Sequence, residues 1–159
     1  MTIKEGHRVP DATMFMMQAG RPTPVSSAEL FEGKKVVLFA VPAAYSPTCS
    51  DGHLPGYVQH AAEFRAKGVD AIICLAVNDA FVLAAWAKDK GAQELQMVAD
   101  GNASFTRALG LEMDASAFGL GVRSQRYAMI VEDGVVKKLN VDAPGKFDLS
   151  RAETMLAAL

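Results

Sequence analysis

The stretch KVVLFAV, residues Lys35–Val41, decides how the rest of the chain is interpreted. It is almost wholly apolar and rich in valine, which is typical of a strand covered on both faces of a sheet. A helical pattern follows at Pro55–Lys67 and ends before Gly68, and a second apolar run occupies Val69–Val77. Strand, helix and strand in this order predict a right-handed parallel crossover at the centre of an α/β fold.

The alternation continues downstream. We expect a helix, a strand and a second helix, in that order, at Asp79–Lys90, Leu95–Ala99 and Ala103–Leu109. Asp133-Gly134 then separates two strand patterns and is typical of a two-residue hairpin turn. The strands it joins are Tyr127–Glu132 and Val135–Val141.

The two ends of the chain complete the pattern. Met14–Gln18 and Pro22–Val25 indicate a hairpin around Gly20, and the spacing of Ser150–Glu153 is that of a capping box, which predicts a terminal helix. Parallel units followed by an antiparallel hairpin predict a mixed central sheet with helices on both faces. The thioredoxin-like α/β architecture fits this order best. With 159 residues, half of them apolar, we expect one domain over residues 1–159.

Composition argues against several classes of partner. A net charge of −2 gives no basic field for a phosphate backbone, so nucleic acid is not expected. The start of the chain lacks a secretory signal pattern, and no apolar run is long enough to cross a membrane. We therefore expect a cytoplasmic protein with no membrane partner.

The chain has two cysteines, Cys49 and Cys74, which are too few for a disulfide scaffold. In a reducing compartment that leaves packing or chemistry as their role. The three histidines form no metal-ligand spacing with the cysteines, so neither a metal nor another cofactor is implied.

Cys49 stands where chemistry is expected. The segment from Pro42 to Cys49 leaves the end of the first buried strand and enters a helix, and ligands of open α/β sheets bind at that edge. Unpaired N–H groups and the positive end of the helix dipole favour a thiolate there. Gly52 and Pro55 follow closely, so the start of the helix is expected to be irregular.

Pro42-x-x-x-Ser46-x-x-Cys49 resembles the active-site motif of peroxiredoxins, and the following His53-Leu-Pro-Gly-Tyr57 is similar to the type II, peroxiredoxin-5-like branch. The similarity extends over nearly the whole chain, through the segments at 77–82, 85–88, 99–102 and 123–127. This resemblance implies a thioredoxin-like thiol peroxidase.

The resemblance also implies roles for four residues. Cys49 would attack the O–O bond of hydrogen peroxide or an alkyl hydroperoxide and become a sulfenic acid. The Ser46 hydroxyl would orient the peroxide, Pro42 would shield the pocket, and Arg126 would stabilise the thiolate and the leaving oxygen. Arg123 is a near competitor for the arginine role.

Two positions depart from the family pattern. Most members have threonine at the position of Ser46, and this branch usually has glycine at that of Ala43. Serine keeps the hydroxyl but loses the methyl group that restricts its rotation. Alanine excludes a backbone conformation that only glycine tolerates, so the loop geometry is less well defined by the resemblance.

The partners follow from the same resemblance. Glutathione with glutaredoxin, or thioredoxin, would reduce the sulfenic acid. Cys74 lies in a buried strand pattern, where it is either a core residue or a resolving cysteine. A homodimer is implied, with Tyr45, Phe81 and Phe118 near its interface or pocket.

The residues around Cys49 argue against other cysteine chemistries. A thiol-disulfide oxidoreductase needs a Cys-x-x-Cys pair, which the chain lacks, and a phosphatase loop needs an arginine soon after the cysteine. His53 is interpreted as structural, because a thiolate held by Arg126 requires no general base. The remaining alternative is a peroxide-sensing or holdase protein with an oxidisable Cys49 and little turnover.

Overall fold

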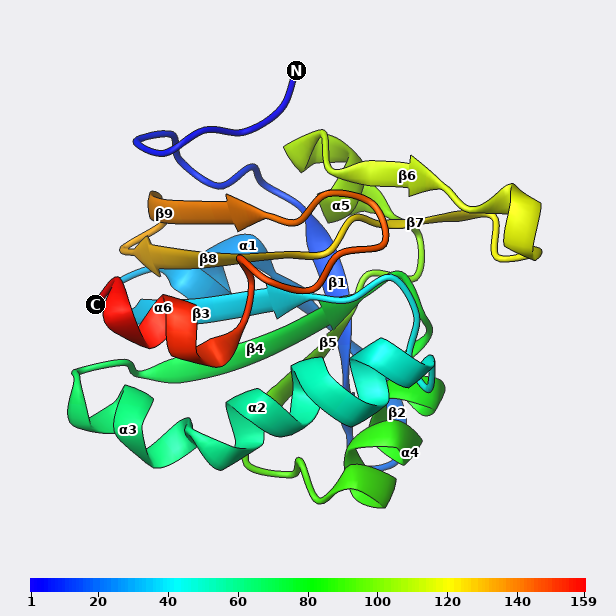
Figure 1. The fold of residues 1–159 in the computed structure, drawn as a ribbon, viewed down its shortest axis with the longest axis horizontal. Coiled ribbons are helices and arrows are strands. Elements are labelled where there is room, and N and C mark those ends of the chain that lie inside the picture. Colours follow the sequence, from blue (N-terminus) through cyan, green and yellow to red (C-terminus); the bar gives the residue numbers. More distant parts are fainter.

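A seven-stranded mixed sheet runs through the computed structural model, which describes residues 1–159 (Figure 1). The strand order is β2-β1-β5-β4-β3-β8-β9, with β3, β4 and β5 parallel and the other neighbours antiparallel. The strands are β1 (Thr13–Gln18), β2 (Arg21–Ser26), β3 (Lys35–Ala40), β4 (Ala71–Ala76), β5 (Gln96–Ala99), β8 (Tyr127–Glu132) and β9 (Val135–Val141). A separate two-stranded arm consists of β6 (Glu112–Asp114) and β7 (Val122–Ser124).

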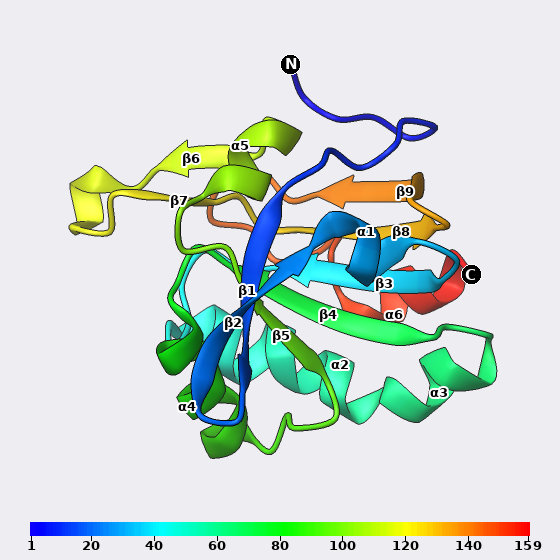
Figure 2. The ribbon, with the colours of Figure 1, turned by 180° about the vertical axis from the view of Figure 1, so that it is seen from behind.

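Helices cover both faces of the sheet (Figures 1 and 2). One face carries α2 (Leu54–Gln59), α3 (Ala61–Ala66), α4 (Ala80–Lys90) and α6 (Ala152–Ala157). The opposite face carries α1 (Ser27–Phe31) and α5 (Ser104–Leu109). Two irregular turns, the π-helical η1 (Cys49–His53) and the 3-10 helix η2 (Ser116–Phe118), complete the elements. The prediction of a thioredoxin-like α/β fold with a mixed sheet is confirmed.

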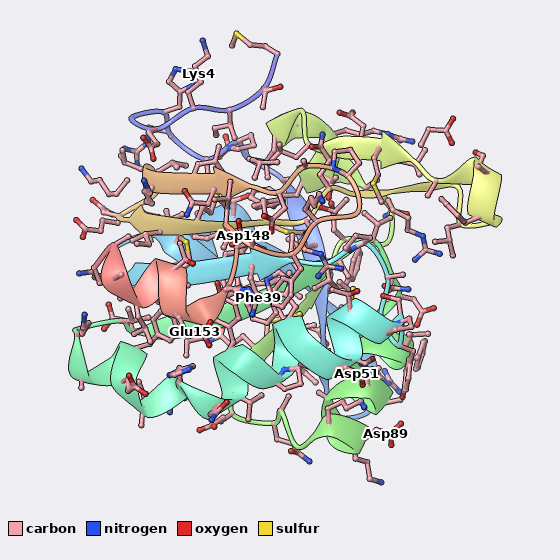
Figure 3. All side chains as sticks on the ribbon, viewed as in Figure 1. Lys4, Phe39, Asp51, Asp89, Asp148 and Glu153 are labelled. Carbon is pink, nitrogen blue, oxygen red and sulfur yellow. The ribbon has the colours of Figure 1, made fainter.

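The core explains why β3 is apolar at every position after its first residue. Val37 and Phe39 face the cluster under α2, α3, α4 and α6, whereas Val36 and Leu38 face the cluster under α1 and α5. Because successive side chains of a strand point to opposite faces, a strand between two helical layers needs apolar residues throughout. Phe39 lies between the sheet and these helices, where its ring stacks on that of Tyr57 with centroids 4.0 Å apart (Figure 3).

Both predicted hairpins and the parallel crossover are present. β3 pairs with β4 in parallel, with Val36 opposite Ala71. At the β8–β9 turn, Asp133 and Gly134 have φ angles of 46° and 78°, the left-handed conformations that a tight hairpin turn requires.

The prediction of one continuous helix at Pro55–Lys67 is wrong. His60, with φ −99° and ψ 8°, separates α2 from α3. The irregular start expected after Cys49 is present, because the π-helical η1 carries the chain from Cys49 into α2. In η1 the Leu54 N–H donates to the Cys49 carbonyl, five residues back. Pro55 has no N–H to offer the preceding turn, which favours this wider ring.

The capping box predicted at Ser150–Glu153 is also wrong. Ser150 is buried and its hydroxyl donates to Asp142, while α6 begins after Arg151, whose side chain makes no cap. Glu153 faces His60 instead, 3.1 Å from its Nε2 atom. The β6–β7 arm was not predicted, because strands of three residues leave no alternation to detect.

The helices are short, and α4, with 11 residues, is the longest of them. None of them combines the length and the apolar character that a crossing of the bilayer demands.

Two glycine-to-alanine changes should alter stability in opposite directions. Gly134→Ala places a side chain at φ 78° and should lower the free energy of unfolding by about 1 kcal/mol. Gly56→Ala lies within α2, where the new Cβ meets only the Ala152 methyl at 3.8 Å, and should raise it by about 0.5 kcal/mol. Urea unfolding of both variants checks the signs, and two changes of the same sign would contradict the backbone assignment.

Candidate active site

Cys49 is held at the carboxyl end of β3 by a short loop. The Val41 N–H donates to the Leu75 carbonyl at 3.0 Å, and the Ala44 N–H donates to Asn78 Oδ1 at 3.1 Å, so the loop is tied to the end of β4 and the residues after it. The chain then turns into a helix, with Pro47 and Thr48 helical ahead of η1. Cys49 is thereby placed in the first helical turn, with its side chain fully buried.

Sheet register brings Arg126 to the same place. Ala40, the last residue of β3, is opposite Tyr127, the first residue of β8, in an antiparallel pair. The residue before β8 and the loop after β3 therefore meet at one edge of the sheet. Arg126 Nη2 donates to Cys49 Sγ at 3.1 Å across 77 positions of sequence. Arg123, the other arginine considered, donates instead to the carbonyls of Val77 and Leu120.

His53 lies on the other side of the guanidinium. Arg126 Nη1 is 2.7 Å from His53 Nδ1, and the Nε2 atom of the same ring is 3.1 Å from the Ser150 carbonyl. Because a guanidinium only donates, Nδ1 must be the acceptor, and Nε2 carries the proton that Ser150 accepts. Burial, and secondarily the Arg126 charge, lower the pKa of His53 to about 3. His53 is therefore a neutral imidazole at physiological pH.

The loop between β3 and Cys49 presents the Ser46 side chain. Ser46 Oγ donates to the Ala43 carbonyl at 2.8 Å, so its oxygen remains free to accept a hydrogen bond. Ala43 is not in the left-handed region, whereas Tyr45 has a φ of 68°. The substitution of alanine at position 43 therefore brings no backbone strain, and the strained residue of this loop is Tyr45.

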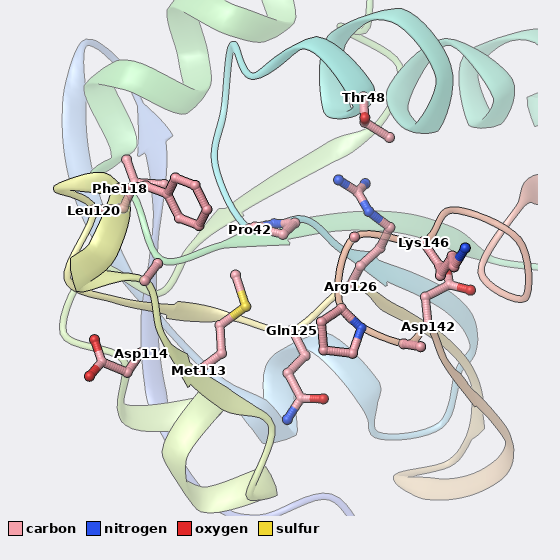
Figure 4. A pocket seen from close by; sticks show the side chains of 14 residues that line it. Pro42, Thr48, Met113, Asp114, Phe118, Leu120, Gln125, Arg126, Asp142 and Lys146 are labelled. Atoms are coloured by element: carbon pink, nitrogen blue, oxygen red, sulfur yellow. The ribbon is translucent and has the colours of Figure 1, made fainter.

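A pocket of about 510 Å³ opens beside Arg126 (Figure 4). It lies between the start of the Cys49 helix, the β6–β7 arm and the loop after β9. Arg126 points from its floor toward Thr48. The lining is formed by Pro42, Thr48, Met113, Asp114, Ala115, Phe118, Leu120, Gln125, Arg126, Asp142, Ala143, Pro144, Gly145 and Lys146. Such a volume has room for an organic group behind a reacting oxygen.

Cys74 stands in the middle of β4, between Phe39 of β3 and Met97 of β5. It is fully buried, in the same apolar cluster as Cys49, and both cysteines are free thiols. Burial, and secondarily the charge of Cys49, raise the pKa of the Cys74 thiol well above its usual range. Cys74 therefore remains protonated at neutral pH.

Three aromatic residues predicted near the pocket or an interface are exposed. The exposed fractions are 47% for Tyr45, 61% for Phe81 and 83% for Phe118. The Tyr45 hydroxyl donates to Asp89 Oδ2 at 2.6 Å. Phe118 belongs to η2, at the tip of the β6–β7 arm, and is the one of the three that lines the pocket (Figure 4).

Sequence reasoning missed part of this arrangement. His53 was interpreted as structural, yet it is a direct hydrogen-bond partner of Arg126. The signal available was its position four residues after Cys49, which places both on one side of a helical turn. Asp142, whose carboxylate accepts from Ser150, had no local signal, because its side chain is connected to the Arg126 side chain only through Ser150 and His53, which the folded chain brings together. No three His, Cys, Asp or Glu side chains are grouped as metal ligands.

Comparisons with known proteins show similarity over nearly the whole chain. The Redoxin family model matches residues 4–156. Peroxiredoxin-2E-2, chloroplastic, from Oryza sativa subsp. japonica is 52% identical over 164 residues, covering 99% of this chain and 73% of the relative. The structure of reduced Prx3 from Vibrio vulnificus in complex with hydrogen peroxide is 55% identical, covers 99% of both chains and has a TM-score of 0.96. The structure of peroxiredoxin 5 from Alvinella pompejana is 33% identical, covers 98% of this chain and 97% of its own, and has a TM-score of 0.85.

The buried neutral His53 predicts a stability loss in mild acid. The unfolded chain protonates this ring near its ordinary pKa of about 6.5, whereas the folded chain does so only near 3, so the unfolded state binds more protons between these values. Between pH 7 and pH 5 the free energy of unfolding should fall by about 2 kcal/mol more in the wild type than in His53→Gln. Urea unfolding at both pH values measures this difference. Equal losses in the two proteins would show that His53 is charged or exposed.

Proposed function

This chain belongs to the peroxiredoxin family, in its type II, peroxiredoxin-5-like branch, and is a thiol enzyme that reduces peroxides; from that premise we propose that Cys49 is its nucleophile. The observation that carries the proposal is the contact of the Arg126 guanidinium with the buried Cys49 sulfur at 3.1 Å. A cation at hydrogen-bond distance stabilises a thiolate where no water reaches it.

The reaction follows from this arrangement. The Cys49 thiolate attacks one oxygen of the peroxide, the S–O bond forms and the O–O bond breaks. The leaving oxygen takes up a proton and departs as water or an alcohol, and Cys49 is left as a sulfenic acid. Arg126 is placed to stabilise the negative charge that develops on the leaving oxygen. Ser46 accepts a hydrogen bond from the peroxide through its free lone pair, and Pro42 shields the pocket from water.

The pocket supports both hydrogen peroxide and alkyl hydroperoxides as substrates. Met113, Phe118 and Leu120 of the arm give one side of the pocket an apolar wall, beside which an alkyl group fits. Hydrogen peroxide has no alkyl group and needs only the Cys49 sulfur, Arg126 and Ser46, of which Arg126 lines the pocket.

We propose an external thiol as the reductant, from the glutathione and glutaredoxin or the thioredoxin system of a reducing compartment such as the cytoplasm. The attacking species in thiol exchange is a thiolate, and the pKa of Cys74 is raised far above neutral. Cys74 also belongs to β4, which is paired with β3 and β5, so its backbone cannot move toward the surface without breaking the sheet. Cys74 is therefore a core residue in this proposal rather than the resolving cysteine.

A homodimer accounts for the exposed aromatic residues. Tyr45, Phe81 and Phe118 are large apolar side chains on the surface, and burial of such groups drives association. Aromatic residues are enriched in protein interfaces. We place the interface over these residues, beside the mouth of the pocket that Phe118 lines.

Replacement of Cys49 and Arg126 tests the mechanism. Cys49→Ser should abolish peroxide consumption, and Arg126→Gln should lower the second-order rate constant with hydrogen peroxide by about 100-fold, because an ionic partner of the sulfur and leaving oxygen is lost. Cys74→Ser is the matched cysteine control and should keep the rate of the first oxidation. Stopped-flow measurements without reductant give these rates, and a wild-type rate for Cys49→Ser would disprove the mechanism.

A charge on the exposed aromatic surface tests the dimer. Phe81→Glu should shift the protein toward monomer, because a carboxylate buried in an interface loses its hydration. Leu149→Glu is the control, since Leu149 is 47% exposed and lies in the loop after β9. Sedimentation velocity at micromolar concentration measures both variants. A wild type that sediments as a monomer would contradict the proposal.

A further inference from the structure

Asp142 is a buried carboxylate that the peroxidase mechanism does not use. It is 4% exposed and directly follows β9, where its N–H donates to the Arg126 carbonyl at 2.9 Å. Its side chain accepts four hydrogen bonds. Oδ1 accepts from the N–H groups of Asp148 and Leu149 at 3.1 and 2.7 Å, and Oδ2 accepts from the N–H and the hydroxyl of Ser150 at 3.2 and 2.5 Å.

These bonds fix one end of the loop over residues 143–150. The loop has no regular structure, and the N–H groups at its end, those of Asp148, Leu149 and Ser150, find their partners in the Asp142 side chain. An ionised carboxylate that accepts several N–H bonds is among the stronger loop anchors, because each bond is charge-assisted. Asp142 therefore determines where the Ser150 backbone lies.

The anchored loop touches the active site at two places. The Ser150 carbonyl accepts from His53 Nε2 at 3.1 Å and from the Tyr57 hydroxyl at 2.8 Å. The Phe147 ring lies 4.9 Å from that of His53 and 5.6 Å from the Arg126 guanidinium carbon. Both contacts involve the His53 ring, which accepts the hydrogen bond from Arg126.

We infer that Asp142 is a positioning residue for peroxide reduction, which acts through the Ser150 carbonyl and the neutral His53 ring to hold the Arg126 guanidinium on the Cys49 sulfur. The geometry gives the reason. One nitrogen of the guanidinium contacts sulfur and the other needs an acceptor, which His53 Nδ1 supplies only while its proton stays on Nε2. The Ser150 carbonyl keeps the His53 proton on Nε2 by accepting its hydrogen bond. Without that carbonyl, the proton could move to Nδ1, where it would face the N–H of Arg126 and displace the guanidinium.

Asp142→Asn tests this inference, because the amide cannot accept all four hydrogen bonds. The matched control is Asp100→Asn. Asp100 is also buried, at 1% exposed, and accepts from the N–H groups of Phe105 and Thr106 and from the Thr106 hydroxyl, with no hydrogen bond to His53 or Ser150. Both variants lose charge-assisted bonds of one buried carboxylate, so both should be less stable. Only Asp142→Asn should slow the oxidation of Cys49.

The readout is the second-order rate constant for hydrogen peroxide without reductant, followed by the fluorescence of Trp86. Trp86 is the only tryptophan, and its Nε1 donates to Ser50 Oγ, next to Cys49. We expect Asp142→Asn to be slower by about tenfold or more and Asp100→Asn to keep the wild-type rate. Nitrogen NMR of labelled histidine should show the Nε2–H form in the wild type and a mixture of forms in Asp142→Asn. Equal rates in the two variants would overturn the inference.

A double-mutant cycle shows whether the effect passes through His53. In a His53→Leu background, which lacks the acceptor for Arg126, Asp142→Asn should cause little further loss of rate. Full additivity would overturn the relay. If Asp142→Asn does not fold, Ser150→Ala replaces it. This change removes one of the four bonds and should still slow oxidation, and a wild-type rate would overturn the inference.

The inference rests on the proposed role of Arg126, and the two fail in different ways. A wild-type rate for Arg126→Gln would remove the proposed mechanism itself. A slow Arg126→Gln together with a wild-type rate for Asp142→Asn would leave the mechanism in place and remove only the part assigned to Asp142.

Discussion

The contact between Arg126 and Cys49 is the interaction on which the rest of the site depends. The sulfur is buried, so water cannot stabilise a thiolate there, and the guanidinium is the charged group within hydrogen-bond distance of it. Charge stabilisation by fixed groups in a dry site is stronger than in solvent. In the proposed mechanism, the guanidinium that stabilises the thiolate also stabilises the charge that develops on the leaving oxygen.

The fold supplies this contact through sheet register. Cys49 follows β3 and Arg126 precedes β8, and the pairing of Ala40 with Tyr127 places the two loops at the same edge. The apolar character of β3 follows from its place between two helical layers. Packing between the helical layers therefore holds β3 in the centre of the sheet. The pairing of β3 with β8 then brings the Cys49 sulfur and the Arg126 guanidinium together at the same edge.

Much of this could be predicted from the sequence where the signal is local. The apolar runs predicted β3 and β4, Asp133-Gly134 predicted the β8–β9 hairpin, and the segment from Pro42 to Cys49 predicted that Cys49 enters a helix after β3. The failures concern residues whose partners are distant. The capping box is wrong because Glu153 pairs with His60 and Ser150 with Asp142, and only the folded chain shows these partners. The break at His60 likewise has no local signal in the sequence. The β6–β7 arm is too short for a periodic pattern.

The most direct test of the account is the intact mass of the reduced protein seconds after one equivalent of hydrogen peroxide is added, with both cysteines native. The account predicts a gain of one oxygen, carried by the peptide that contains Cys49, because the sulfenic acid has no thiolate within the chain to react with. Loss of two hydrogens would contradict the assignment of Cys74 to the core. An unchanged mass would contradict the central claim that Arg126 makes Cys49 reactive toward peroxide.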